Sequence, residues 1–151
     1  MPGLEFYRMD LHVHTPASSC YLHHGHTEKD IVDAAIAAGM NAIAITDHNT
    51  GEWIDRVKKA ANGTDLVVFP GVEISTSLGY HVVALLDPSA GRSDAENLLG
   101  ALDVFASSYG KPDALCKSAL DGIMDAIHDR GGLAVLPHRQ CQGSLQASDH
   151  A

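Results

Sequence analysis

The chain has 151 residues and a formal net charge of −9, with ten basic residues against nineteen acidic ones. This length suits one domain with a hydrophobic core, and the negative charge disfavours nucleic acid as a partner, because the two would repel each other. The apolar runs, such as that over 133–137, are too short to span a bilayer, and no signal peptide is visible. We therefore expect a cytoplasmic domain that has no membrane partner.

In chain order, the expected elements are a strand over 9–13, a helix from Thr27 to Gly39, a strand over 42–46, a helix over 51–61, strands over 66–69 and 81–86, helices beginning at Ser93 and Pro112, and a strand over 133–136. Asp30 and Glu96 are the expected capping partners of Thr27 and Ser93. The alternation of strands and helices predicts parallel βα units. From Arg139 the sequence turns polar, so we divide it into a domain over 1–138 and a tail over 139–151.

Ten histidines are an excess that directs attention to metal binding. His12 and His14 are two residues apart, so a strand presents both on one face and begins a metal site; two surface histidines on an edge strand are the alternative. Asp47 and His48 directly follow the strand over 42–46, at the end where parallel sheets collect functional groups. Asp47 also suits the cap of the next helix.

Glu73 stands in a β-rich apolar stretch, where a carboxylate is costly unless it is paired or bound to metal. The alternative is an exposed glutamate on a strand edge. His81 begins one expected strand and His138 follows another. Singly, each is more often a core or surface histidine than a ligand, but four of the five expected strands carry a histidine at an end and the other is followed by Glu73. This recurrence predicts one shared metal site.

In these motifs the chain resembles the PHP (polymerase and histidinol phosphatase) superfamily, and the likeness runs from 10 to 138 through DLHVHT at 10–15, TDH at 46–48, PGVEI at 70–74, His81 and GGLAVLPH at 131–138. The resemblance implies an α/β fold, a (βα)7 barrel with up to three metals at the C-terminal face of its strands. Carried over by motif, His12 and His14 hold the first metal, Glu73 bridges the first and second, His81 and His138 complete the second, and His48 holds a third.

Two features depart from the family pattern. Cys20 stands where the family usually has a histidine or aspartate ligand of the third metal; a thiolate also binds zinc, iron or manganese, with zinc favoured by its softness. Alternatively, one of the loop histidines His23, His24 and His26 substitutes, although we expect these to be solvent-exposed, or the third site binds metal weakly.

The second departure concerns the final Asp-x-His motif of the family, which the sequence lacks. Asp149 and His150 are adjacent to each other and follow no expected strand. We therefore expect an incomplete or open barrel, with a sheet edge through which a second copy of the chain can pair.

The resemblance implies a metal-dependent phosphoesterase with two or three divalent ions (Zn, Mn or Fe), acting on a small phosphorylated substrate through a metal-activated water. Asp47 and His48 are the expected catalytic residues, with Asp47 orienting His48 or a bound water. A non-catalytic metal-binding PHP module, a fragment of a larger protein, and a nuclease are the alternatives.

Overall fold

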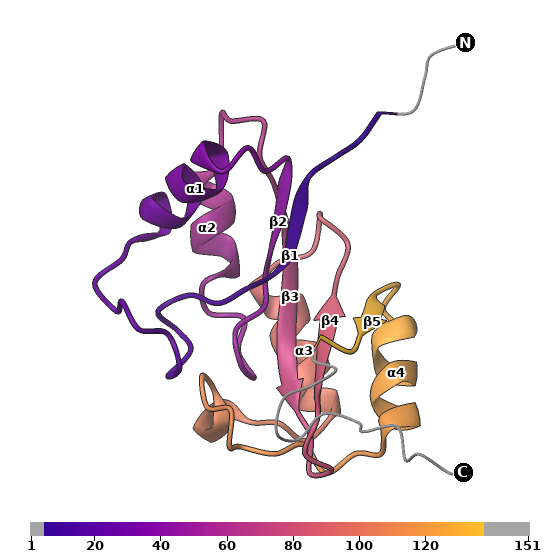
Figure 1. The fold of residues 1–151 in the computed structure, drawn as a ribbon. Coiled ribbons are helices and arrows are strands. Elements are labelled where there is room, and N and C mark those ends of the chain that lie inside the picture. Colours follow the sequence, from indigo (N-terminus) through magenta and orange to yellow (C-terminus); the bar gives the residue numbers. More distant parts are fainter. Residues whose placement is uncertain (1–4, 138–151) are drawn as a thin grey trace, which may run out of the picture.

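The computed structural model describes residues 5–137 (Figure 1). Its strands are β1 (Met9–Val13), β2 (Ala42–Ile45), β3 (Val67–Ser75), β4 (His81–Leu85) and β5 (Leu133–Val135). Its helices are α1 (Glu28–Ala37), α2 (Ile54–Ala60), α3 (Arg92–Ala101), the short 3-10 helix η1 (Ala106–Ser108) and α4 (Leu120–His128). His138, the polar tail, Asp149 and His150 lie outside the described residues.

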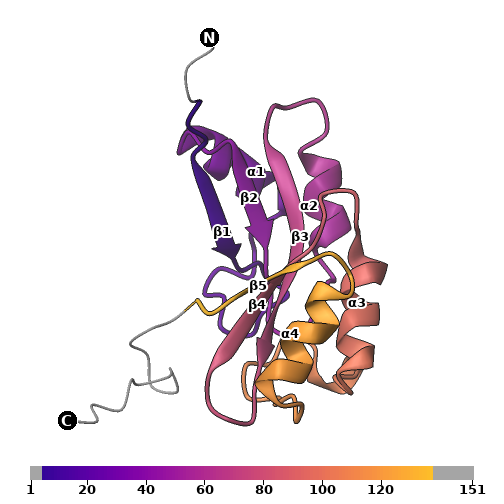
Figure 2. The same ribbon diagram turned by 90° about the vertical axis from the view of Figure 1, so that its right-hand side faces the viewer.

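The five strands form one curled sheet in the order β1-β2-β3-β4-β5 (Figure 2). β1, β2 and β3 are parallel, whereas β4 is antiparallel to both β3 and β5. The prediction of parallel βα units is therefore wrong for β4. Only residues 76–80 connect β3 to β4, and a parallel return needs a dozen residues or more, so these two strands form a hairpin.

The helices lie on one side of the sheet (Figure 2). The main core fills the layer between these helices and the sheet. Val72 and Val82 point into this core from the strands, where they meet Leu98 and Ile123 from the helices. Because strand side chains alternate between faces, the same strands carry a second, smaller cluster on the other side: Ala44, Val83 and Leu85, with Leu11 and Phe69 packed against it. We call this other side the inner face.

Within the described residues, β1 pairs only with β2 and β5 only with β4. The fold is thus α/β with an open, incomplete barrel, as expected. A homo-oligomer formed through such an edge stays a prediction. No helix in the described part of the chain has both the length and the apolar character needed to cross a membrane.

Three helix starts differ from the sequence prediction, and the first of them is that of α2, which begins at Ile54 rather than at 51. Thr27 and Asp30 form the expected capping box of α1, but α3 begins at Arg92, after Gly91, whose N–H donates to Asp94 Oδ2 (2.9 Å). The expected cap of Ser93 with Glu96 is wrong, because Glu96 instead accepts a hydrogen bond from the guanidinium of Arg92 (2.6 Å).

The helix expected from Pro112 begins only at Leu120. The segment before it bonds to the end of β3 instead: the Cys116 N–H donates to the Ser75 carbonyl (2.7 Å), and the Cys116 carbonyl accepts from the Ser77 N–H (2.9 Å). Tertiary hydrogen bonds have replaced the first turns of the expected helix.

Candidate metal centre

Glu73 and His81 reach the inner face of the sheet through strand alternation. Glu73 shares a face of β3 with Phe69, and Val83 is its partner across the ladder. His81 lies two residues before Val83 and therefore points the same way. Because β4 is antiparallel, its first residue lies beside the last residue of β3, Ser75. The start of one strand and the end of the other thus meet at one edge.

Three more histidines of the cluster around Glu73 come from β1, β2 and the residues that follow these strands. His12 lies in β1, His14 follows it, and His48 follows β2 and pairs with Glu73 in an isolated bridge. Parallel strands end at the same edge of a sheet, which places these side chains beside Glu73. Glu73 itself lies inside β3, which is longer than the expected strand over 66–69.

Glu73 is the hub of the site, and its carboxylate is fully buried. Its Oε2 atom lies 2.8 Å from His14 Nε2, 3.2 Å from His12 Nε2 and 3.3 Å from His48 Nδ1, and its Oε1 atom lies 2.7 Å from His81 Nδ1. Histidine nitrogens therefore surround both oxygens of one carboxylate.

This arrangement sets the charge of Glu73 and His48, the two buried groups of the histidine cluster. Burial raises the pKa of Glu73, but hydrogen bonds with His12, His14 and His81 outweigh it and hold that pKa far below its ordinary value. Burial lowers the pKa of His48 to about 4, with the charge of Glu73 opposing the shift and the neighbouring histidines adding to it. At neutral pH the site therefore holds an ionised glutamate and a neutral His48.

Asp47 is also fully buried, but it faces the loop after β1 rather than the histidines. Its carboxylate accepts hydrogen bonds from the Thr15 N–H (2.7 Å), the Thr15 hydroxyl (2.6 Å) and the Ser18 hydroxyl (2.6 Å). Burial raises the pKa of Asp47, and these hydrogen bonds oppose the rise. The Ser18 oxygen in turn accepts from the His48 N–H (3.1 Å). Asp47 thus fixes the backbone on both sides of the site, and it caps no helix.

The donor set fits a divalent metal. His48 Nδ1 is buried and makes no hydrogen bond, although it lies 3.3 Å from Glu73 Oε2. His12 Nε2 and His14 Nε2 face each other at 3.0 Å, close to the spacing of about 3.3 Å that Zn–N bonds impose on neighbouring ligands in a tetrahedral site. Within residues 5–137, three donor groups each have their ligand atoms within 4.8 Å of one another: His12, His14 and Glu73; His48, Glu73 and His81; and His14, Cys20 and His48.

Cys20, the position that departs from the family pattern, lies with its Sγ atom 3.2 Å from His14 Nδ1. Burial raises the pKa of its thiol, and the residue as a whole is exposed. The loop histidines are exposed, as expected, and His26 Nδ1 lies 2.9 Å from the Tyr21 hydroxyl. The structure thus brings every predicted ligand within residues 5–137 into at least one of the three donor groups.

The sequence reasoning missed the backbone clamp that holds the site loops. The Gly110 N–H donates to the His48 carbonyl (2.8 Å), and the Gly110 carbonyl accepts from the Ser19 N–H (2.8 Å). Asn49, fully buried at a φ of 50°, donates from its side chain to the Lys111 and Ala114 carbonyls. The segment after α3 is therefore hydrogen-bonded to the loop that follows β1 and to the loop that follows β2. No sequence motif at Gly110 predicts this role.

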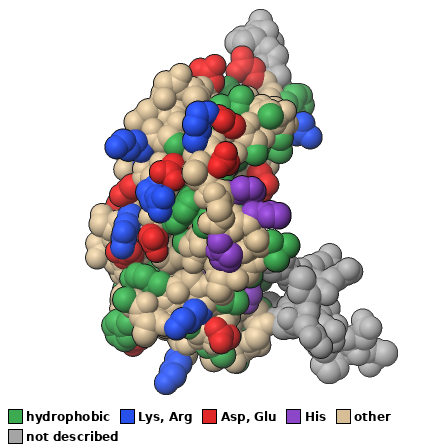
Figure 3. Space-filling model, turned by 90° about the vertical axis from the view of Figure 1, so that its left-hand side faces the viewer, with side chains coloured by type: hydrophobic (Ala, Val, Ile, Leu, Met, Phe, Trp, Pro, Cys, Tyr) green, Lys and Arg blue, Asp and Glu red, His purple; other side chains and the backbone are tan. Residues whose placement is uncertain are grey.

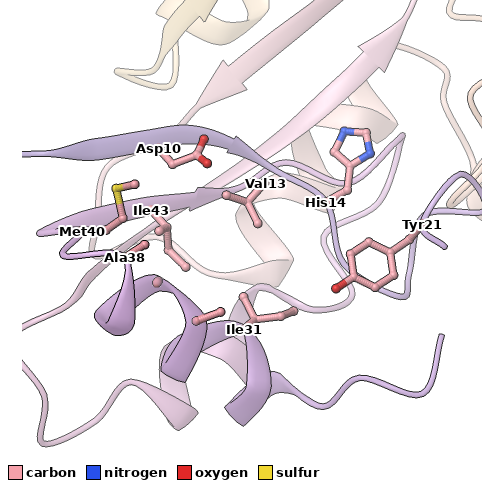
Figure 4. Close-up of a pocket in the computed structure, with 10 residues that line it drawn as sticks. Asp10, Val13, His14, Tyr21, Ile31, Ala38, Met40 and Ile43 are labelled. Carbon is pink, nitrogen blue, oxygen red and sulfur yellow. The ribbon is translucent and has the colours of Figure 1, made fainter. Parts of the chain in front are cut away.

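A pocket of about 280 Å³ opens beside His14, between β1 and α1 (Figure 4). Its walls are mostly apolar and include Ile31, Ala38 and Ile43, with Tyr21 beside His14. On the face of the molecule shown in Figure 3, histidine side chains gather near the middle, while the basic side chains are scattered among acidic ones. On this face the basic side chains form no continuous patch.

Comparison with known proteins gives the family. The model of the PHP domain matches residues 10–121. A 5'-3' exoribonuclease of Haemophilus influenzae is 37% identical over 81 residues, which cover 52% of this chain and 28% of that protein. An error-prone DNA polymerase of Symbiobacterium thermophilum is 29% identical over 105 residues, covering 70% of this chain and 10% of the polymerase. The chain therefore matches only a minor part of the length of either relative.

Among solved structures, a Bifidobacterium adolescentis protein assigned as a metal-dependent phosphoesterase superposes with a TM-score of 0.59 at 16% identity. The match covers 96% of this chain and 72% of that one, and at this identity it shows the fold. Since the family model spans most of the chain and includes every clustered histidine described above, the chain belongs to the PHP domain family.

Proposed function

We propose that this chain is a metal-dependent phosphoesterase, a hydrolase that cleaves a small phosphorylated substrate with a metal-activated water. The observation that carries the proposal is the fully buried Glu73 carboxylate with four histidine nitrogens within 3.3 Å of its oxygens. A carboxylate and neutral imidazoles in one cluster are the ligands that zinc, manganese and iron use in hydrolytic sites. Membership of the PHP family agrees with this chemistry.

We assign each histidine to one ion, because a neutral imidazole has a single lone pair. His12, His14 and Glu73 would hold the first ion, Glu73 and His81 the second, and His48 and Cys20 the third. From the family pattern, His138 joins the second group; it lies outside the described residues. Bound divalent ions supply a water of lowered pKa and positive charge for the phosphate oxygens.

The chain's own residues prepare this chemistry. His48 stays neutral at pH 7 because its pKa is about 4, so it keeps the lone pair that ligation requires. Glu73 stays ionised and can join two of the groups. Asp47 holds the loops that carry His14 and His48 through Thr15 and Ser18. We therefore assign Asp47 a positioning role, through His48, in the proposed reaction.

A small substrate suits the charge of the protein. The chain has a net charge of −9, and the basic side chains on the face shown in Figure 3 are scattered. A long polyanion would find no complementary groove there, whereas a single phosphate group needs only the local charge of bound ions.

The experiment joins elemental analysis of the purified chain with hydrolysis of a chromogenic phosphate ester. We expect two or more transition-metal ions per chain with turnover, and in His12→Ala the loss of turnover together with the ion of the first donor group. Bound metal without turnover on any generic ester would favour a non-catalytic metal-binding module instead. Absence of metal after reconstitution with zinc, manganese and iron would rule out the proposal.

A nuclease is the second candidate, because the chain is 37% identical to part of a 5'-3' exoribonuclease. The discriminating assay compares a chromogenic monoester with a short single-stranded RNA oligonucleotide under the same metal loading. Cleavage of the oligonucleotide alone would select the nuclease and displace the small-substrate proposal.

A further inference from the structure

Cys20 brings a sulfur atom into a centre whose other described donors are nitrogen and oxygen. Its Sγ atom lies 3.2 Å from His14 Nδ1. The same sulfur lies within 4.8 Å of a ring nitrogen of His14 and of a ring nitrogen of His48. His48, the third member of this group, has a side chain that is 5% exposed, and its Nδ1 atom, 3.3 Å from Glu73 Oε2, is buried without a hydrogen bond. The sulfur therefore belongs to a group of three side chains that could hold a metal ion.

Cys20 is also the one member of its donor group that belongs to no other of the three groups. His14 and His48 each belong to a second group, in which they share Glu73, and a neutral imidazole has only one lone pair to give. His14 already directs Nε2 at Glu73 Oε2 (2.8 Å). An ion at the Cys20 position consequently depends on the sulfur more than on either histidine.

We infer that Cys20 makes this metal position soft and oxidation-sensitive: it holds zinc while the sulfur is reduced and releases it when the sulfur is oxidised. Thiolate is a soft ligand that favours zinc over harder ions such as manganese, and zinc binding displaces the thiol proton. The inference rests on the proposed metal centre, and it adds a form of regulation to that centre.

The position is open to a small oxidant, because Cys20 is exposed whereas Cys116 is buried. With hydrogen peroxide as the oxidant, the sulfur attacks one peroxide oxygen, an S–O bond forms and the O–O bond breaks. The sulfur loses two electrons, the other oxygen leaves as hydroxide, and the product is a sulfenic acid. That product is a poorer zinc ligand than the thiolate, so zinc leaves while the nitrogen and oxygen donors of the other groups are unchanged.

The test measures zinc released into a colorimetric chelator when the zinc-loaded full chain is treated with hydrogen peroxide. A Cys141→Ser background leaves Cys20 and the buried Cys116 as the remaining thiols. We expect release of about one zinc per chain together with oxygen addition on the Cys20 peptide by mass spectrometry. The matched variant Cys20→Asp supplies an oxygen donor, and we expect no peroxide-dependent release from it.

Equal release from both proteins, or oxidation of Cys20 without release, would overturn the inference. A second measurement needs no variant at Cys20: zinc should slow alkylation of Cys20 by iodoacetamide about 10-fold or more, and unchanged alkylation would also overturn it. Turnover of the chromogenic ester is recorded separately. Turnover without a Cys20-bound zinc refutes the inference alone, whereas Cys20-bound zinc without turnover refutes only the proposed hydrolase.

Discussion

His81 Nδ1 lies 2.7 Å from Glu73 Oε1, although the two residues belong to strands that run in opposite directions. The hairpin between β3 and β4 pairs Ser75 with His81, so the beginning of β4 meets the edge at which β1 and β2 end. An antiparallel strand thus contributes to the site from its first residue, whereas the parallel strands contribute from in or just beyond their C-terminal ends. The hub at Glu73 is where both contributions converge.

Removing the charge of Glu73 should weaken metal binding by the two donor groups that share it. In Glu73→Gln the side chain keeps its shape, but its amide nitrogen faces the histidines that the carboxylate oxygens now contact. We expect at least one metal ion per chain to be lost and turnover to fall by about 100-fold or more. Elemental analysis and ester hydrolysis provide the measurements. Glu52→Gln, on an exposed residue, is the matched control and should keep its metal.

His12→Ala should remove one donor without disturbing the core, because His12 is only partly buried. We expect the affinity for the first metal to fall by about 100-fold or more, measured by competition with a chelating dye. His128→Ala is the matched control, since His128 is exposed in the last turn of α4. If the two variants bind metal equally well, His12 is not a ligand.

The variant Asp47→Asn tests whether Asp47 positions the site loops or takes part directly in the proposed reaction. The asparagine amide nitrogen would face Thr15 and Ser18 groups that now donate to the carboxylate, so we expect a loss of about 1–3 kcal/mol in the free energy of unfolding. Urea denaturation checks this, with the exposed Asp113→Asn as control.

The positioning role also predicts that turnover of Asp47→Asn falls together with its metal content. A variant of unchanged stability and full metal content that has lost turnover would assign Asp47 to the reaction itself.

The sequence was sufficient to predict which residues meet but not the direction of every strand. The His-x-His pair, Asp47-His48 and His81 each lie at the end of an expected strand, Glu73 follows another expected strand, and parity alone puts His12 and His14 on one face. The reversal of β4 and the late start of α4 depend on hydrogen bonds between distant segments, such as that from the Cys116 N–H to the Ser75 carbonyl. Local patterns carry no information on such bonds.

The clamp at Gly110 gives a test of those distant contacts. Gly110 has a φ of 72°, and a Cβ atom there would lie 2.2 Å from the Ala17 carbonyl oxygen. Gly110→Ala should therefore push apart the loops that carry Cys20 and His48 and cost roughly 1–3 kcal/mol of unfolding free energy. We also expect the zinc held at Cys20 to be lost before the other ions.

Gly100→Ala is the matched control, because Gly100 lies in α3 and a Cβ atom there would meet nothing within 4 Å. Alanine is the better helix former by about 0.5–1 kcal/mol, so this variant should be neutral or more stable in urea. Similar stability of the two alanine variants would show that the Gly110 clamp contributes little.

Chelation should destabilise the folded chain, because the bound ions join residues from four different strands or strand ends. A ligand that binds only the native state at 100 times its Kd adds about 2.7 kcal/mol to the free energy of unfolding. We expect the Tm to fall by several degrees when a chelator strips the metal-loaded chain and to recover when zinc is restored. In Glu73→Gln the same treatment should shift the Tm much less, since the shared ligand of two donor groups is gone. An unchanged Tm in the wild-type chain would mean that the histidine cluster is held by protein contacts alone, and a metal-free structural role would then account for Glu73 and its neighbours.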